Sequence, residues 1–245
     1  MNRLQVYNRI KEGEPLSLIR CGDGEKIVLE GFDHYGNYNS VLKRQLGYSP
    51  SIEEAERIRE NLIKAINGCD ILGVPKHKNL DSMHKHWKEV ETTIDKHCQA
   101  PSLRCPTDIH YELLENKDYE SLLTSKPISY IGCRDLVTGM SERFKTHKVD
   151  WYQIAPEAKY TSGWEGPKHY PDQFNKVEKW MDTVRAHGKI LLVGAGFIGK
   201  IYCNWWRDRG GIGLDIGSIM DEWAGRVTRG ADRELDKIET TKWTL

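Results

Sequence analysis

Residues 189–199 read KILLVGAGFIG, an apolar run followed at once by a glycine-rich turn. A short apolar run bounded by glycine predicts a buried strand, and the amphipathic stretch 200–209 predicts the helix that follows it. Gly194, Gly196 and Gly199 form the pattern G-x-G-x-x-G, which in this strand–helix context is typical of turns that bind phosphate at a helix N-terminus. A tight turn that simply needs small residues would give the same pattern. The segment therefore predicts an α/β fold, with or without a nucleotide site.

The rest of the chain alternates between apolar runs and amphipathic stretches in the same way. Further strands are expected at 16–19, 69–74, 127–132, 149–154 and 212–216. Helices are expected at 51–68, 82–98, 107–114, 136–144 and 171–187, and the stretch 160–171 is the longest expected loop, of a kind that often covers a site. Strands joined by crossover helices pair in parallel. We expect one domain over residues 1–245, with a Rossmann-like, mostly parallel sheet and helices on both of its faces.

Composition and charge narrow the class of protein. Lys and Arg together number 36, as do Asp and Glu, so no net charge attracts the chain to nucleic acid or to an anionic membrane. The six cysteines form no C-x-x-C pair and are expected to stay reduced, which favours the cytoplasm. No run approaches the roughly 18 apolar residues that span a bilayer, and the first residues do not resemble a signal peptide. A cytoplasmic globular protein is the expectation.

The segment RCGDGE, residues 20–25, follows the first expected strand. Asp23 and Glu25 would point to one side of an extended turn, where carboxylate oxygens suit Mn²⁺ or Mg²⁺. Gly22 and Gly24 would let the backbone approach a ligand closely, and Arg20 could bind a phosphate with two nitrogens. The plain alternative is that Asp23 caps a helix whose dipole favours Glu25 in its first turn. Spacing alone does not separate a metal site from a helix start.

Two further strand ends carry polar side chains. Gly132 ends an expected strand, and Arg134 follows it at the edge of the sheet where open α/β folds bind ligands, although a solvated helix start would look the same. Asp215 and Ser218 follow the last expected strand. Asp215 could accept a ribose hydroxyl proton, act as a general base or cap the next helix. His110, on an otherwise apolar helix, is either a core residue or a site residue.

Together these motifs resemble the GT-D class of glycosyltransferases, first defined on bacterial domains of the DUF1792 family. The hallmark of that family is a D-x-E motif after the first strand, which Asp23 and Glu25 match. The glycine-rich turn at 194–199 and the segment LDIGS at 214–218 also match. The resemblance runs from about residue 16 to residue 221, but residues 76–106 match nothing in the family. We expect this stretch to be a helical insertion on the acceptor side.

The resemblance implies a metal-dependent glycosyltransferase of the hexosyltransferase type, with a nucleotide sugar, commonly linked to UDP, as donor. It implies that Asp23 and Glu25 hold Mn²⁺ or Mg²⁺, which stabilises the departing diphosphate. Backbone groups of the glycine-rich turns and the side chains of Arg20, Arg134 and Ser218 would bind the nucleotide. These roles belong to the family resemblance and not to the spacing of the residues.

The base and the acceptor stay open at this point. If the reaction inverts the anomeric centre, a carboxylate deprotonates the acceptor hydroxyl; Asp215 is one candidate, and Asp33, Glu157 and Asp221 are others. The resemblance implies a glycan or another hydroxyl-bearing acceptor, while the balanced charge does not indicate nucleic acid. No motif encodes the donor sugar, the stereochemical outcome or the oligomeric state. An NAD- or S-adenosylmethionine-dependent enzyme built on residues 194–215 and a non-catalytic nucleotide-binding protein are the alternatives.

Overall fold

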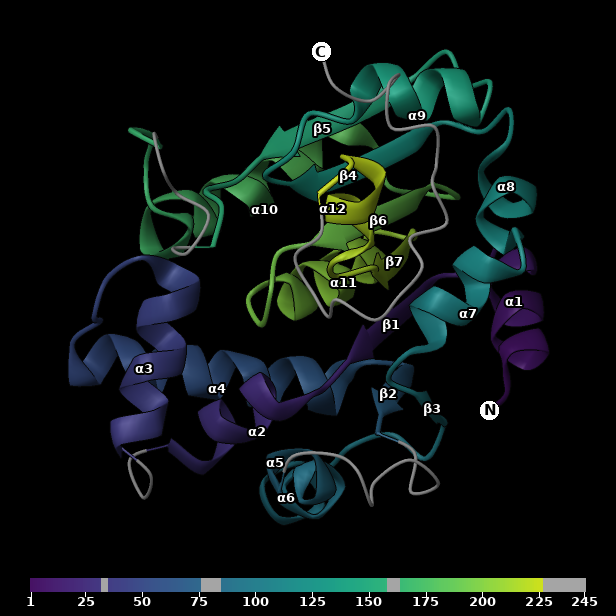
Figure 1. The fold of residues 1–245 in the computed structure, drawn as a ribbon. Coiled ribbons are helices and arrows are strands. Elements are labelled where there is room, and N and C mark those ends of the chain that lie inside the picture. The colour runs from purple at the N-terminus through teal and green to yellow at the C-terminus, as the bar shows by residue number, and fades with distance from the viewer. Residues whose placement is uncertain (32–34, 76–84, 158–163, 227–245) are drawn as a thin grey trace.

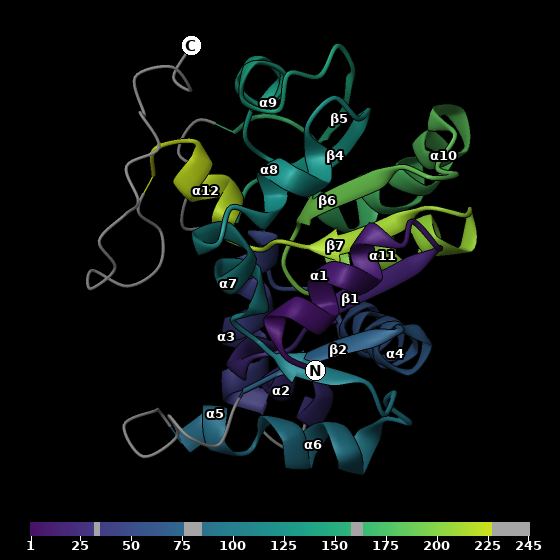
Figure 2. The same cartoon turned by 90° about the vertical axis from the view of Figure 1, so that its right-hand side faces the viewer.

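The computed structural model describes residues 1–31, 35–75, 85–157 and 164–226. Within this part of the chain, one sheet has the strand order β3-β2-β1-β7-β6-β4-β5, and all its pairings are parallel. Figure 2 shows the strands in this order, from β5 and β4 near the top to β2 near the bottom. The strands are β1 (Leu16–Arg20), β2 (Ile71–Val74), β3 (Arg104–Pro106), β4 (Ile128–Gly132), β5 (Val149–Gln153), β6 (Ile190–Gly194) and β7 (Ile212–Asp215). The predicted α/β fold with a parallel sheet is confirmed.

Helices cover both faces of the sheet, as predicted (Figure 1). One face packs against α2 (Asp23–Glu30), α3 (Tyr35–Leu46), α4 (Ile52–Gly68), α6 (Val90–His97), α10 (Phe174–Val184) and α11 (Gly199–Asp208). The other face packs against α1 (Arg3–Lys11), α7 (Ile109–Glu115), α8 (Asp118–Leu123), α9 (Val137–Arg143) and α12 (Ile219–Trp223). Two short elements, α5 (Lys85–Lys88) and the π-helical turn η4 (His169–Gln173), precede α6 and α10. None of the described helices is long and apolar enough to cross a membrane.

The side chains of the central strand β6 divide between two hydrophobic cores. In β6, Leu191 and Val193 belong to the core beneath α11, whereas Ile190 and Leu192 belong to the core beneath α7 and α9. Successive side chains of a strand point to opposite faces, so a strand covered on both faces needs an unbroken apolar run. This is why the run at 189–193 predicts a central strand.

The chain leaves two neighbouring strands in opposite directions. It runs from β4 outwards to β5 at one edge of the sheet, but from β6 inwards to β7. Loops that diverge in this way leave room between the carboxyl ends of the two strands, and open parallel sheets bind ligands at such a point. A pocket lies here, lined by residues that follow both strands.

The sequence patterns do not predict α1, α3, α8 or β3. Strand β3 has three residues and ends on a proline, which is too short for a periodic pattern to register. Because β3 pairs with β2 at the edge of the sheet, residues 104–106 belong to the sheet and not to a helical insertion. The rest of the expected insertion is helical in α5 and α6, while residues 76–84 lie outside the described residues.

Candidate active site

The segment after β1 turns directly into helix α2. Asp23 is the first residue of this helix, and Gly22 precedes it. Glu25 reaches back, so that its Oε2 accepts the Gly22 N–H at 2.8 Å, and Asp23 Oδ1 accepts the Gly24 N–H at 2.9 Å. The expected extended turn is therefore wrong, because both carboxylates belong to the first helical turn and satisfy its N–H groups. The backward reach of Glu25 nevertheless brings its carboxylate to the end of the helix where Asp23 lies.

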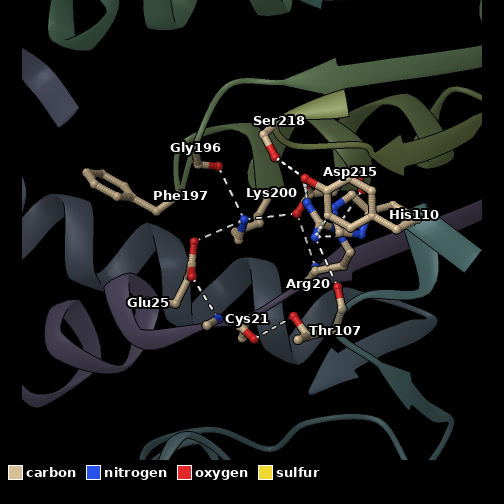
Figure 3. Close-up of polar contacts among 12 residues, drawn as sticks. Arg20, Cys21, Glu25, Thr107, His110, Gly196, Phe197, Lys200, Asp215 and Ser218 are labelled. Atoms are coloured by element: carbon tan, nitrogen blue, oxygen red, sulfur yellow. Dashed lines mark hydrogen bonds and ion pairs between the residues drawn. The ribbon is translucent and has the colours of Figure 1, made fainter. Parts of the chain in front are cut away.

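A buried lysine joins this turn to the glycine-rich helix. Lys200 of α11 places its ammonium 3.1 Å from Glu25 Oε1 and 2.9 Å from Asp215 Oδ2 (Figure 3). It also donates to the carbonyl oxygen of Gly196 at 3.3 Å. Burial lowers the pKa of Lys200, but Asp215 and Glu25 outweigh burial and raise this pKa above its usual value. The ammonium is a fixed positive charge that links the carboxyl ends of β1, β6 and β7.

Asp215, at the end of β7, is enclosed by cations. Its side chain is 5% exposed, and its Oδ1 lies 3.2 Å from Arg20 Nη2. Its Oδ2 accepts the Arg20 backbone N–H at 3.2 Å in addition to the bond from Lys200. Burial raises the pKa of Asp215, but Arg20 and Lys200 outweigh burial and lower this pKa below its usual range. A carboxylate that is held ionised, with both oxygens bonded, is a weak proton acceptor, so the geometry favours a positioning role over that of catalytic base or ribose contact.

Arg20 is committed to contacts inside the protein. Its Nε donates to the backbone carbonyl of Asp215 at 2.9 Å, and its Nη1 donates to the carbonyl of Thr107 at 3.0 Å. The same Nη1 lies 3.0 Å and 2.9 Å from the two ring nitrogens of His110 on α7. Arg20 thus ties β1 to β7 and to the turn before α7. The phosphate contact predicted for Arg20 gains no support, and His110 serves as a packing partner of this guanidinium.

The pocket at the carboxyl ends of β4, β5, β6 and β7 takes further residues from α3 and η4. These are Gln45, Leu46 and His169. Four residues predicted for the site also line the pocket: Arg134, Gly194, Gly196 and Ser218. The other predicted residues are outside its lining: Arg20, Gly22, Asp23, Gly24, Glu25, Gly132, Gly199 and Asp215. The structure therefore divides the predicted site into a pocket and an adjoining ionic cluster around Lys200.

The glycine-rich turn forms one wall of the pocket. Gly196 has a φ of +56°, and a Cβ there would lie 2.4 Å from Gln45 Oε1. A Cβ on Gly194 would lie 2.3 Å from the Met220 sulfur. The positive φ at Gly196 therefore requires glycine, whereas a side chain at Gly194 would have to displace Met220. Gln45 Oε1 also accepts the Phe197 N–H at 3.3 Å, so an amide oxygen already binds an N–H that phosphate would use in such a turn.

Arg134 supplies positive charge to the pocket. Its Nε donates to Asp221 Oδ1 at 2.9 Å, and its side chain is 12% exposed. Within the described residues, its two terminal nitrogens have no partner. Ser218, which also lines the pocket, is bonded through its hydroxyl to Tyr111 at 2.7 Å. Arg134 therefore keeps donors for an anionic ligand, in the fork geometry that suits a phosphate.

The sequence patterns do not single out Lys200, Gln45 or His169. Lys200 directly follows the G-x-G-x-x-G pattern, and this position is the signal that could have marked it. Gln45 lies in the last turn of α3, a helix that the patterns do not predict, and His169 belongs to the loop that was expected to cover a site. Of the alternative bases, Glu157 and Asp221 line the pocket, whereas Asp33 lies outside the described residues.

The turn after β1 suits a hard cation only if oxygen atoms of a bound substrate complete the coordination of the cation. Among the described residues, no group of three or more His, Cys, Asp and Glu side chains could hold a metal ion. Glu25 has a partner at each oxygen, while Asp23 Oδ2 has none in the part of the chain that the structure describes. Mg²⁺ commonly binds one or two carboxylates plus phosphate oxygens of a substrate. The donor set fits a cation of that kind, with Asp23 offering the unbonded oxygen.

Comparisons with known proteins agree on family and fold. The model of the GT-D-like family, a GT-D fold-like domain, matches residues 3–223. A selenomethionine-substituted structure of a DUF1792 domain is 15% identical, with a TM-score of 0.61 over 98% of this chain and 87% of its own. A structure of the same domain, described as having a distinct glycosyltransferase fold, is 14% identical, with a TM-score of 0.60 over 99% of this chain and 88% of its own.

A third similar structure is a glycosyltransferase (DUF1792) from Streptococcus sanguinis. It is 16% identical, with a TM-score of 0.57 over 97% of this chain and 91% of its own. No curated protein matches the chain. At these identities the three structures show a shared fold.

Proposed function

The chain belongs to the GT-D-like family and has a glycosyltransferase fold, and we propose that it moves a sugar from a UDP-linked donor to an acceptor hydroxyl with the help of a divalent cation. The observation that carries this proposal is a contact between the turn after β1 and the helix α11, which lie far apart in the sequence. Glu25 pairs with Lys200 at 3.1 Å, and Lys200 holds the carbonyl of Gly196, which lines the pocket. The D-x-E turn therefore adjoins the pocket, within reach of a diphosphate that is bound there.

The diphosphate of the donor is proposed to bind between Arg134 and the glycine-rich turn. Arg134 offers its terminal nitrogens, which have no partner among the described residues. The Phe197 N–H stands at the turn itself and would exchange Gln45 Oε1 for a phosphate oxygen. An N–H group bonds more strongly to an anionic oxygen than to a neutral amide oxygen, which favours this exchange.

Asp23 and Glu25 would hold the cation, Mn²⁺ or Mg²⁺, together with oxygens of the diphosphate. When bound, the cation supplies the charge that stabilises the diphosphate as it leaves the sugar. The chain itself fixes the carboxylate of Glu25, through Lys200 on one oxygen and the Gly22 N–H on the other. A carboxylate held in one orientation loses little conformational entropy when it binds a ligand.

The acceptor is proposed to be a glycan or another molecule with a hydroxyl group. For a reaction that inverts the anomeric centre, Glu157 is the proposed base, because it lines the pocket. Asp221 lines the pocket as well and is the second candidate, whereas Asp215 lies outside the lining and is enclosed by Arg20 and Lys200. We place the reaction in the cytoplasm, which the six free cysteines favour.

The NAD- and S-adenosylmethionine-dependent alternatives lose their main support at Asp215. A dinucleotide site needs an acidic side chain about 20 residues after the first glycine of the pattern, to accept the ribose hydroxyls. Asp215 stands in that position, but both of its carboxylate oxygens are already bonded to Arg20 and Lys200. No other observation favours a redox or methyl-transfer site over a nucleotide-sugar site.

A donor screen tests the proposal. The purified chain is incubated with Mn²⁺ and a panel of nucleotide sugars, and release of the nucleoside diphosphate is followed with and without candidate acceptors. We expect release from a UDP-sugar, its loss on addition of a chelator, and its loss in Asp23→Asn. Glu53→Gln is the matched control, because Glu53 is 81% exposed on α4, outside the pocket and the ionic cluster.

Two results would overturn the proposal in different parts. Full turnover by Asp23→Asn in the presence of chelator would show that the reaction needs no metal, and the proposed sugar transfer would still stand. Thermal stabilisation by NAD or S-adenosylmethionine, with none from UDP and Mn²⁺, would replace the glycosyltransferase with one of the alternatives.

A further inference from the structure

His169 lies in the wall of the pocket with its imidazole almost wholly buried. It opens η4, and 7% of the residue is exposed. Its Nε2 lies 2.9 Å from the hydroxyl of Tyr202 on α11. The other ring nitrogen, Nδ1, has no partner in the described part of the chain. A ring nitrogen without such a partner, on a residue that lines a pocket, is available to hydrogen-bond with a ligand bound there.

The contact at Nε2 decides where the imidazole proton lies. Burial holds the pKa of the Tyr202 hydroxyl well above its usual value, so this hydroxyl keeps its proton. Among the described residues, His169 Nε2 is the one hydrogen-bonding contact of this hydroxyl, so we assign Nε2 as the acceptor of its proton. Burial also lowers the pKa of His169 to about 3, so the imidazole is neutral and carries one proton. Because Nε2 accepts, that proton lies on Nδ1, and His169 presents an uncharged N–H donor.

Apolar side chains line the part of the pocket that lies on the α11 side of the sheet. They come from α3, from the end of β5 and from the glycine-rich turn: Leu46, Ile154, Phe197 and Ile198. His169 packs on this side too, with its ring 5.7 Å from that of Tyr202. An uncharged donor among apolar groups suits the carbonyl oxygen of a flat, uncharged ring, whereas a phosphate would need compensating charge.

The charged part of the pocket lies on the other side of the sheet. Arg134 and Asp221 pair there at 2.9 Å, next to Met220, which belongs to the core beneath α7 and α9. The pocket therefore crosses the end of the sheet from an apolar part to a charged part. A nucleoside diphosphate has the same division, since its base is flat and uncharged and its diphosphate is anionic.

We propose that His169 Nδ1 donates a hydrogen bond to a ring carbonyl oxygen of the donor's nucleobase and thereby selects uracil over adenine, which has no such oxygen. The inference rests on the proposed function, since it takes the pocket as the nucleotide site. It makes His169 a specificity-determining residue and Tyr202 the positioning residue that fixes the imidazole proton on Nδ1.

Calorimetric binding of UDP and of ADP, each with Mn²⁺, tests this role in the wild type, His169→Phe and His169→Asn. Phenylalanine fills the space without a donor, whereas asparagine offers an amide N–H at about the place of Nδ1. We expect the wild type to prefer UDP and His169→Phe to bind UDP about tenfold more weakly, the worth of roughly one hydrogen bond, with ADP binding unchanged. His169→Asn should keep the preference. His147→Phe, at an exposed histidine, is the control.

The possible failures are distinct. Equal UDP affinity in the wild type and His169→Phe overturns the inference and leaves the proposed function standing, and so does a wild type that binds ADP as tightly as UDP. A wild type that binds no nucleoside diphosphate overturns the proposed function and the inference with it. If His169→Phe does not fold, Tyr202→Phe takes its place, because it frees the proton to move to Nε2; an unchanged preference for UDP in that variant overturns the inference.

Discussion

Two neighbouring regions at the same end of the sheet use their charged residues in opposite ways. After β1 and β7, the side chains of Arg20, Glu25, Lys200 and Asp215 pair with one another at 2.9 to 3.2 Å and form a closed cluster. In the pocket after β4 and β6, Arg134 keeps its terminal nitrogens without a partner among the described residues. The closed cluster joins strands, and the pocket keeps donors for a ligand. A charged residue at a strand end can therefore be assigned to a ligand only when its contacts within the protein are known.

Removing the central cation should break the closed cluster. Lys200→Met keeps most of the side-chain volume but leaves the carboxylates of Glu25 and Asp215 without their shared partner. Deleting one partner of a buried ion pair typically costs about 3–5 kcal/mol, because the remaining charge stays desolvated. We expect the free energy of unfolding to fall by that amount, measured by urea titration with circular dichroism.

The control for this variant is Lys179→Met, at an exposed lysine of α10. We expect its free energy of unfolding to stay within about 0.5 kcal/mol of the wild type. A Lys200→Met variant as stable as the wild type would show that the cluster does not hold the strands together, and the contrast with the pocket would lose its basis.

The pocket should respond to loss of charge in activity and not in stability. The double variant Arg134→Gln/Asp221→Asn removes both members of the ion pair, so that no unpaired charge is left buried. Hydrogen bonds to charged groups are worth about 1.5–3 kcal/mol, so kcat/KM for the UDP-sugar should fall about 10- to 100-fold at an unchanged melting temperature. Unchanged kcat/KM in the folded double variant would exclude Arg134 from the donor site.

The sequence predicts the fold best where an element is marked by its own residues. The apolar run at 190–193 needs no tertiary information, because a short apolar run that ends at a glycine is typical of a strand buried on both faces. Helix α3 begins YGNYNS, a poor helix-forming sequence, and depends on buried residues such as Tyr38, Val41 and Leu42 for its stability. Strand β3 depends on its pairing with β2 in the same way. Local sequence patterns do not predict elements that depend on tertiary contacts.

The sequence predicts which strand ends lie near one another but not what their side chains contact. The positions of Arg20 and Asp215 at expected strand ends place both at one edge of the sheet although they lie 195 positions apart, and the structure shows them in contact. Their roles depend on their partners, because Lys200 occupies the Asp215 carboxylate that could otherwise act as a base. His169 carries no motif at all, since its value as a donor comes from burial and from the hydroxyl of Tyr202. The role of each side chain depends on the residues that it contacts, and the fold determines those contacts.

Acid should destabilise the wild type through His169. Burial lowers the pKa of His169 to about 3, whereas an unfolded imidazole has a pKa of about 6.5. Between these values the unfolded chain binds a proton that the folded chain excludes, so the free energy of unfolding falls as the pH falls, by up to about 1.4 kcal/mol per pH unit. This effect is absent above about pH 6.5, where neither state binds the proton.

The measurement compares the wild type with His169→Asn, which cannot titrate. From pH 7.5 to pH 5.0 the wild type should lose about 2 kcal/mol more in free energy of unfolding than the variant, since about 1.5 pH units of that range lie below the unfolded pKa. The carboxylates are the same in both chains and cancel in the difference. Parallel pH profiles would mean that the imidazole is not held neutral in the folded pocket.

The smallest expected effect belongs to Gln45, which contacts the glycine-rich turn from α3. Its Oε1 accepts the Phe197 N–H at 3.3 Å, the group proposed to bind phosphate. Gln45→Ala removes this competitor, so UDP should bind more tightly, by about fivefold at most, because a neutral hydrogen bond is worth about 1 kcal/mol. Gln45→Glu puts a negative charge at the same place and should weaken UDP binding. Calorimetry measures both, with Gln99→Ala at an exposed position as control. If Gln45→Ala instead weakens binding, Gln45 is itself a ligand contact, and the pocket draws on α3 for its donors as well as on the strand ends.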